Sequence, residues 1–365
     1  IVINACSVRK SAIDRIAGNF KKYKKYKKKN PKLKIVLTGC VLENDKEKFE
    51  KLFDLVVDIK EIEKLLEKIK ECHSELVSES TKNNDLTVPM SSKLSISKVG
   101  KTDDNKQKIL KQVQDDSNGI ATFPSVARND SNNYFQIQPK HQSKSSAYVP
   151  IMTGCNNFCS YCVVPYTRGK EYSRPVEEIV NEIRNLIKNG YEEIILLGQN
   201  VNSYSKSNPT NWIPASAGMT KSARMTGMVT FPKLLRLIND IPGNFWIRFL
   251  TSHPKDMTEE LIKTISECEK VTSYIHLALQ SGNDEILKKM NRKYTAKHFL
   301  NLIKIIGKYL PDAAISTDVI VGFPGETERQ FQKTVEVMKK VKFDMAYINK
   351  YSPRAGTASY KMKDN

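Results

Sequence analysis

The stretch "YVPIMTGCNNFCSYCVVPYTRG", residues 148–169, places three cysteines directly after a short apolar strand. Cys155, Cys159 and Cys162 follow a C-x3-C-x2-C spacing, and the aromatic Tyr161 precedes the last of them. A structural zinc site takes four ligands, usually in two cysteine pairs, and this sequence has no second pair. A [4Fe–4S] cluster is also held by thiolates, and three thiolates leave one iron open to a substrate or cofactor. The spacing therefore favours an iron–sulfur cluster with an open position.

The sequence around this loop alternates strand and helix patterns in a way that predicts a barrel. Strands are expected at 148–152, 192–198, 245–250, 273–279, 313–322 and 344–350, with amphipathic helices between them. Strands that alternate with helices form parallel sheets, and six such units predict a (β/α)6 partial TIM barrel. Barrel enzymes hold their chemistry at the carboxyl ends of the strands. The three cysteines follow the first strand, at that edge.

Residues 1–72 also alternate strands and helices, which predicts a separate doubly wound, flavodoxin-like domain. Its first strand, "IVINAC", ends in Cys6, and its second strand, "KIVLTGC", ends in Cys40. A third strand, "FDLVVD", and a helix, "IEKLLEKIKE", follow. Because ligands of such folds bind at the carboxyl ends of the strands, we expect Cys6 and Cys40 to lie close together.

Two stretches interrupt these patterns and are rich in Ser, Asn, Lys and Asp without periodicity. They are residues 73–146 and residues 205–228, and their composition predicts disordered or loosely packed insertions. The expected organisation is therefore an N-terminal domain at 1–72, a linker at 73–146, and a barrel at 147–360 that carries the second insertion.

The charge of the chain favours a polyanionic partner. Lys and Arg number 59 against 40 Asp and Glu, a net charge of +19, and the densest basic run is "KKYKKYKKKNPKLK" at 21–34. Nucleic acid is the commonest partner for such a field, although lysine-rich solvated faces give the same composition. The sequence contains no run of 18 apolar residues, so no membrane span is predicted. It has seven cysteines but shows no secretion signal. We therefore expect reduced thiols and a cytoplasmic location.

Nine motifs point to one family: "INACSVR" (3–9), "VLTGC" (36–40), "MTGCNNFCSYCVVPYTRGKEYSRP" (152–175), "LLGQNVNSY" (196–204), "RFLTSHPKD" (248–256), "HLALQSGND" (276–284), "MNRKYT" (290–295), "STDVIVGFPGETE" (316–328) and "DMAYINKYSPRAGT" (344–357). With them the chain resembles the radical S-adenosylmethionine (SAM) methylthiotransferases. The resemblance is greatest to the branch that adds a 2-methylthio group to N6-isopentenyladenosine beside the anticodon of tRNA. It covers most of 1–60 and 147–360, outside the two insertions.

The resemblance implies two [4Fe–4S] clusters and SAM as cofactors. Cys155, Cys159 and Cys162 would hold the catalytic cluster, while Cys6 and Cys40 would hold an auxiliary one. The third auxiliary cysteine is expected upstream, in a G-C-Q-x-N type motif, and an RNA-binding β-barrel is expected after residue 360. This sequence contains neither.

We also expect polar and backbone contacts to SAM from the strand ends, with the aromatic residue of the cysteine motif near the adenine. The candidates are Tyr161, Gly198, Gln199, Asn200, Ser252, Gln280 and Asp318. Arg168 and Arg292 are candidates for the SAM carboxylate or an RNA phosphate. We interpret Cys72 and Cys268 as ordinary thiols, and His253 and His276 as structural or supporting residues.

The expected partners are the anticodon stem-loop of tRNA and an electron donor such as flavodoxin or ferredoxin, with the enzyme acting as a monomer. Three alternatives remain open at this point. One is a related methylthiotransferase for threonylcarbamoyladenosine or a ribosomal protein. The second is an inactive remnant that folds and binds RNA, and the third is a zinc-binding structural protein.

Overall fold

A computed structural model describes residues 2–6, 10–31, 33–41, 43–58, 61, 64–65, 68, 135, 143–208 and 227–362. The predicted helix at 62–71 and the thiol of Cys72 lie almost entirely outside these residues. So does the segment 73–146, except for Phe135 and residues 143–146. No helix among the described residues combines the length and the apolar character that a membrane crossing requires.

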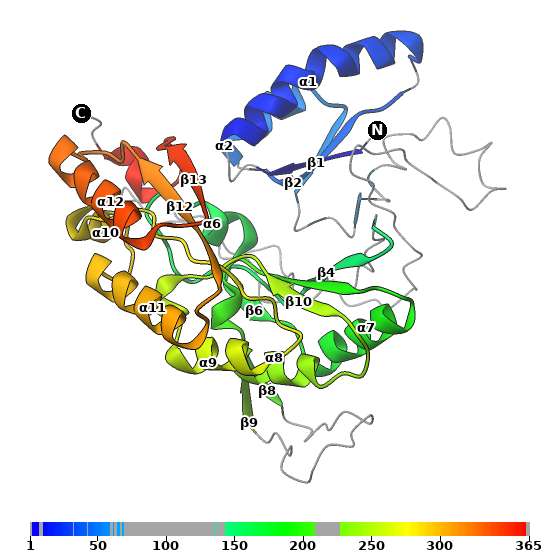
Figure 1. Cartoon of the computed structure of the whole chain (residues 1–365). Coiled ribbons are helices and arrows are strands. Elements are labelled where there is room, and N and C mark those ends of the chain that lie inside the picture. Colours follow the sequence, from blue (N-terminus) through cyan, green and yellow to red (C-terminus); the bar gives the residue numbers. More distant parts are fainter. Residues whose placement is uncertain are drawn as a thin grey trace.

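Six parallel strands form the barrel (Figure 1): β4 (Ser146–Pro150), β7 (Glu193–Leu197), β10 (Trp246–Phe249), β11 (Tyr274–His276), β12 (Ala314–Val321) and β13 (Met345–Lys350). They form two three-stranded sheets, ordered β4-β7-β10 and β11-β12-β13. Parallel bridges between Ile247 and Val271 and between Ser252 and Leu277 connect the two sheets. The predicted (β/α)6 partial barrel is therefore confirmed.

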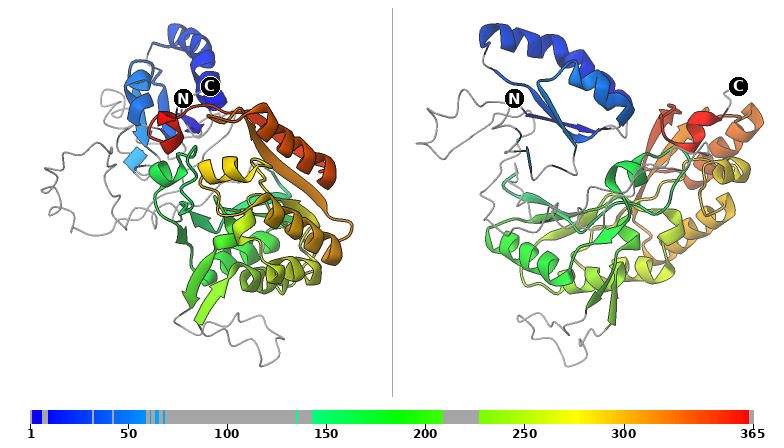
Figure 2. Two further views of the ribbon diagram at one scale, coloured as in Figure 1. Left: turned by 90° about the vertical axis from the view of Figure 1, so that its left-hand side faces the viewer. Right: turned by 180° about the vertical axis from the view of Figure 1, so that it is seen from behind.

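Helices follow the strands and cover their outer side (Figures 1 and 2): α7 (Val176–Lys188), α8 (Phe231–Asn239), α9 (Glu259–Glu267), α10 (Asp284–Lys289), α11 (Ala296–Tyr309) and α12 (Glu328–Val341). Their apolar residues recur at helical spacing. In α7, for example, Val176, Ile179, Val180 and Ile183 are all buried against the core. A capping box formed by Thr327 and Gln330 sets the start of α12.

The residues after the cysteine loop form small elements that the sequence pattern did not predict. They are the helix α6 (Val164–Arg168) and an antiparallel pair, β5 (Met152–Thr153) with β6 (Tyr172–Ser173). The short 3₁₀ helices η2 (Val201–Ser203), η4 (Pro254–Asp256) and η5 (Ala358–Lys361) complete the barrel. The β5–β6 pair closes the cysteine loop at its base.

Both ends of the segment that we predicted as a disordered or loosely packed insertion, 205–228, form strands that the sequence pattern did not predict. Strands β8 (Ser205–Asn208) and β9 (Gly227–Thr230) pair antiparallel, with Ser205 opposite Thr230 and Asn208 opposite Gly227. This ladder gives the backbone groups of both segments hydrogen-bond partners. Residues 209–226 lie outside the described part of the chain.

The N-terminal domain contains β1 (Val2–Cys6), α1 (Lys10–Lys29), β2 (Val36–Cys40), α2 (Glu43–Glu50) and β3 (Leu55–Asp58). Its parallel strands are ordered β1-β2-β3. Ile16 of α1 and Phe49 of α2 pack with Leu37 and Phe53 in a small core. The sequence pattern missed α2 because "ENDKEKFE" contains a single apolar residue.

Candidate active site

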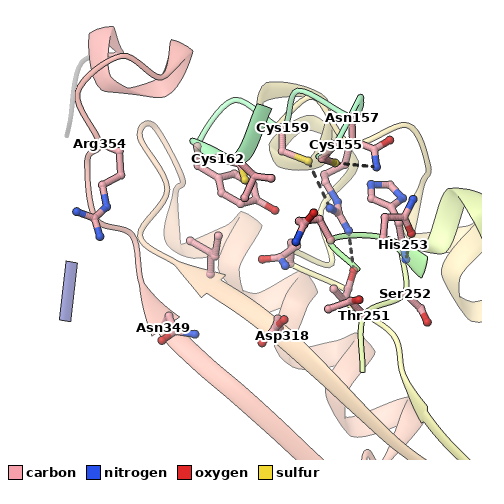
Figure 3. Close-up of a pocket in the computed structure, with 18 of the residues that line it drawn as sticks. Cys155, Asn157, Cys159, Cys162, Thr251, Ser252, His253, Asp318, Asn349 and Arg354 are labelled. Atoms are coloured by element: carbon pink, nitrogen blue, oxygen red, sulfur yellow. Dashed lines mark hydrogen bonds between the residues drawn. The ribbon is translucent and has the colours of Figure 1, made fainter. Parts of the chain in front are cut away.

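A cavity of about 490 Å³ opens at the carboxyl ends of the barrel strands. Figure 3 shows the three cysteines grouped on one loop, facing polar residues that come from several strand ends. Of the residues predicted from the sequence, the following line this cavity: Cys155, Cys159, Tyr161, Cys162, Gln199, Asn200, Ser252, Gln280, Asp318 and Arg292. Residues separated by up to 163 positions, from Cys155 to Asp318, therefore come together at one place.

Gly198 and Arg168 do not line the cavity. The carbonyl oxygen of Gly198 accepts a hydrogen bond of 2.8 Å from Thr251 Oγ1. A Cβ on Gly198 would lie 2.5 Å from Cγ of Met152. Gly198 therefore allows close packing against Met152. A sequence motif alone does not distinguish a glycine needed for packing from one that contacts a cofactor.

The cysteine loop is held by contacts with the residues that end α10. The Ser160 hydroxyl donates to the Lys289 carbonyl at 2.8 Å, and the Ser160 N–H donates to the Met290 carbonyl at 3.0 Å. The side-chain amide of Asn291 donates to the Phe158 carbonyl at 2.8 Å. The two Ser160 bonds use carbonyls at the end of α10 that have no partner within the helix, and the three bonds together fix the loop against the barrel.

The thiols of the loop are half-buried and carry no disulfide. Burial raises the pKa of Cys155 and raises the pKa of Cys162 to about 12. Both are therefore protonated in the protein alone, and metal binding must displace these protons. Among the described residues, no three Cys, His, Asp or Glu side chains surround a single ion position. The three thiols on one loop would hold an iron–sulfur cluster, whose irons take thiolate ligands.

Several buried polar atoms in the cavity wall have no hydrogen-bond partner among the described residues. They include Gln199 Oε1, Ser252 Oγ, Gln280 Oε1 and Ser352 Oγ. Gln280 also has a φ of 64°, a left-handed conformation that costs free energy for a residue other than glycine. Buried polar groups normally have partners. The cavity therefore fits a polar ligand with several hydrogen-bonding groups, as SAM is.

Asn200 and His253 both line the cavity, and hydrogen bonds fix their side chains. The side-chain amide of Asn200 donates to Asp256 at 2.7 Å, and its oxygen accepts the His253 N–H at 3.2 Å. Burial, together with the charges of Arg292 and Lys255, lowers the pKa of His253 to about 2. Its ring is therefore neutral, and Nδ1 accepts the Lys255 N–H at 3.1 Å.

A chain of polar side chains leads to the cavity, and the sequence reasoning named only His276 and Asp318 among its members. Tyr274 OH lies 2.6 Å from Ser316 Oγ, which lies 2.9 Å from His276 Nδ1. The other ring nitrogen of His276 lies 3.1 Å from the Asp318 carboxylate. These residues alternate along β11 and β12, so the period-two pattern of the strands was the available signal.

The last strand also supplies cavity residues to which the sequence reasoning assigned no role. Asn349, Lys350, Tyr351, Ser352 and Arg354 follow or end β13 and line the cavity. Figure 3 shows Asn349 and Arg354 on the side of the cavity opposite His253. Their position at a strand end was the signal that could have identified them.

Cys6 and Cys40 end neighbouring parallel strands, and the two residues are register partners in the β1–β2 ladder. The backbones of Cys6 and Cys40 therefore lie close together, as expected, because the Cα atoms of register partners in adjacent strands are about 5 Å apart. A cluster bound there remains a prediction.

Comparison with known proteins agrees with the class of enzyme that this fold and cysteine loop define. The model of the radical SAM superfamily matches residues 149–338, and the model of the uncharacterized protein family UPF0004 matches residues 1–59. The chain is 39% identical to the tRNA-2-methylthio-N(6)-dimethylallyladenosine synthase of Clostridium novyi, over all of this chain and 68% of that protein. It is also 39% identical to the same enzyme of Thermoanaerobacter pseudethanolicus, over all of this chain and 65% of that protein.

The chain therefore belongs to the radical SAM superfamily and, within it, to the family of these tRNA methylthiotransferases. It spans about two thirds of the length of the curated relatives it matches. Among solved structures, it is similar to the cobalamin-dependent S-adenosylmethionine radical enzyme OxsB with aqua-cobalamin bound. The TM-score is 0.53 at 13% identity, covering 96% of this chain and 45% of that one. At that identity the likeness shows the fold alone.

Proposed function

We propose that the chain transfers a methylthio group to C2 of N6-isopentenyladenosine next to the anticodon of tRNA. The observation that carries the proposal is the cavity in which three thiols on one loop face the buried polar atoms of Gln199, Ser252 and Gln280. The family membership gives the reaction class, and the names of the relatives give the tRNA substrate.

The reaction needs a radical because the C2–H bond of adenine resists removal by a base. When SAM is bound beside a reduced cluster, the cofactors supply the radical chemistry, and the protein positions and shields them. Cys155, Cys159 and Cys162 would hold the cluster at the cavity. Gln199, Ser252 and Gln280 would hold SAM through the hydrogen bonds they lack in the protein alone.

Acidic and basic side chains both line the cavity. Asp318 on β12, held by His276, presents a carboxylate to the cavity, which suits the hydroxyl groups of a ribose. Arg354 and Lys350 lie at the end of β13 and suit an anionic group. The net charge of +19 supports a polyanionic substrate.

We extend the proposal to an auxiliary [4Fe–4S] cluster that includes Cys6 and Cys40. Their register pairing at the carboxyl edge of β1 and β2 supports this assignment. The proposal also includes a one-electron donor such as flavodoxin or ferredoxin, because a radical SAM cluster must be reduced before each turnover. A monomeric enzyme and a cytoplasmic location belong to the same proposal.

The substrate is tested by comparing tRNA nucleosides from a strain with and without the gene by mass spectrometry. Loss of 2-methylthio-N6-isopentenyladenosine in the deleted strain is the expected result. If this nucleoside is unchanged and the threonylcarbamoyl derivative or a ribosomal protein loses its methylthio group, the related activity replaces the proposal.

The number of clusters is tested by anaerobic reconstitution of the purified chain and iron analysis. About eight iron atoms per chain correspond to two clusters, and about four correspond to the catalytic cluster alone. A colourless protein that binds one zinc ion and no iron contradicts the enzyme proposal and favours the structural alternative. A chain that binds RNA without iron favours the inactive remnant.

A further inference from the structure

Arg292 is a buried cation beside the cysteine loop, and three of its nitrogens have partners. Nη1 donates to Cys159 Sγ at 3.4 Å, a contact drawn as the dashed line that reaches Cys159 in Figure 3. Nη2 donates to the Ala278 carbonyl at 3.0 Å, and Nε donates to Tyr294 OH at 3.1 Å. The backbone of the barrel and the tyrosine therefore fix the guanidinium with one edge toward the sulfur.

Tyr294 makes this orientation rigid. Its hydroxyl lies 3.0 Å from the Ala278 carbonyl and 2.6 Å from the Leu279 carbonyl, to which it can donate. The guanidinium carbon also lies 5.0 Å from the centre of the Tyr294 ring. Both side chains are buried. The planar fork of Arg292 is thus held before any cofactor is present.

The charge of Arg292 has no carboxylate partner in the described part of the chain. The groups that act on it electrostatically are Tyr294, Tyr161 and Cys159. A buried cation without a counter-charge is costly. The cavity that Arg292 lines is therefore where an anionic group that balances its charge would lie.

We propose that Arg292 is a positioning residue for the catalytic cluster: it donates a hydrogen bond to the Cys159 ligand sulfur and makes the cluster easier to reduce. This inference rests on the proposed function, since it needs a cluster on the three cysteines. Hydrogen bonds to ligand sulfurs and the net charge around a cluster both set its reduction potential. A positive donor at the sulfur stabilises the reduced form, which carries the additional electron.

The contacts favour this role over binding of the SAM carboxylate. A carboxylate is best recognised when both terminal nitrogens of an arginine point to it. In Arg292 one terminal nitrogen donates to Cys159, and the other donates to Ala278. The two terminal nitrogens of Arg292 therefore have different partners, the ligand sulfur and the barrel backbone, and do not point together at a carboxylate.

The test is a redox titration of the reconstituted protein, without SAM, followed by electron paramagnetic resonance. Arg292→Met removes the donor and the charge, and we expect at least a tenfold lower equilibrium constant for reduction, or about 59 mV for a one-electron couple. Arg292→Lys keeps a charged donor and should recover part of this loss. Arg248→Gln, which removes a positive charge paired with Glu193 on β7, is the matched control and should leave the potential unchanged.

The outcomes separate this inference from the proposed function. If the wild-type chain assembles no cluster, the proposed function fails. If it assembles a cluster whose potential is the same in wild type and in Arg292→Met, only the role of Arg292 is overturned. If Arg292→Met does not fold, Arg292→Lys and Tyr294→Phe decide the question. A lowered potential in both supports the proposal, and wild-type potentials in both contradict it.

Discussion

Gly154 and Lys170 approach each other so closely that a Cβ on Gly154 would lie 2.1 Å from the Lys170 carbonyl oxygen. Gly154 directly precedes Cys155, and the Cys155 N–H donates to the Gly169 carbonyl at 3.2 Å. The entry and the exit of the cysteine loop are therefore in contact through backbone atoms. The position of the first cysteine depends on the absence of a side chain one residue before it.

This contact predicts that Gly154→Ala displaces the loop and lowers the iron retained after reconstitution. Gly169→Ala is a matched control, because the two glycines have similar φ angles, 81° at Gly154 and 77° at Gly169. A Cβ added at Gly169 would meet nothing within 4 Å. Both variants place an alanine at a positive φ, which costs about 1 kcal/mol or more. Only Gly154→Ala adds the steric clash. Equal iron content in the two variants, measured against wild type, contradicts this explanation.

Replacement of any one of Cys155, Cys159 and Cys162 by alanine should remove about four iron atoms per chain. The visible charge-transfer absorption of the catalytic cluster should be lost as well. Cys268→Ala serves as the control, because Cys268 is buried at the end of α9 and does not line the cavity. It should keep the iron content of wild type. Retention of full iron in a loop variant would assign the cluster to other ligands.

Ser160→Ala should loosen the cysteine loop without changing a ligand. The variant removes the hydrogen bond from the hydroxyl to the Lys289 carbonyl, a loss of about 1 kcal/mol. We expect faster release of iron to a chelator, measured at several temperatures. Ser266→Ala is the control, because the Ser266 hydroxyl donates to the Lys263 carbonyl on the exposed surface of α9. Iron release at the same rate in both variants would show that Ser160 does not anchor the loop.

The carboxylate of Glu193 should contribute stability that disappears in acid. The hydrogen bond from Ser146 and then that from Arg248 lower the pKa of Glu193 in the folded chain. A group with a lowered folded pKa stabilises the fold above its unfolded pKa and loses this effect as the pH falls through its folded value. Because both partners are partly exposed, with 24% of the Glu193 side chain and 36% of the Arg248 side chain accessible, solvent screens the pair and the effect should stay below about 1 kcal/mol.

Urea unfolding of Glu193→Gln and wild type at pH 7 and at successively lower pH tests this pKa argument. The variant should be less stable at pH 7, and the difference should shrink as the pH falls below about 4. Glu177→Gln, a change on the exposed face of α7, is the control. A difference that stays constant with pH would place the cost of Glu193→Gln in packing and not in charge.

The barrel was predictable because its strands and helices follow local hydrophobic patterns. The strand β12 lies inside the stretch predicted at 313–322, and α7 lies between the strands predicted at 148–152 and 192–198, where an amphipathic helix was expected. The missed elements depend on contacts that no local pattern contains. For example, β5 forms only because Met152 and Thr153 pair with Ser173 and Tyr172, about twenty residues further along the chain.

The cavity was predictable to the extent that its residues end strands. Gln199, Ser252 and Gln280 follow this rule, and the structure places all three in the cavity wall. Gly198 follows the same rule but packs against Met152. The contact between Arg292 and Cys159 joins residues that are 133 positions apart. Such a contact is set by the packing of α10 against the cysteine loop, which strand and helix periodicity does not encode.

The β8–β9 ladder makes the length of the segment between its strands nearly independent of the barrel. Ser205 and Thr230 are register partners at the base of the ladder, and α8 begins at the next residue, Phe231. The entropy of closing a loop grows only slowly with its length, so the pair of strands can carry a short or a long connection at similar cost. Residues 209–226 are therefore an exchangeable position, where a two-residue turn or an affinity tag could replace the native sequence while η2 and α8 keep their places.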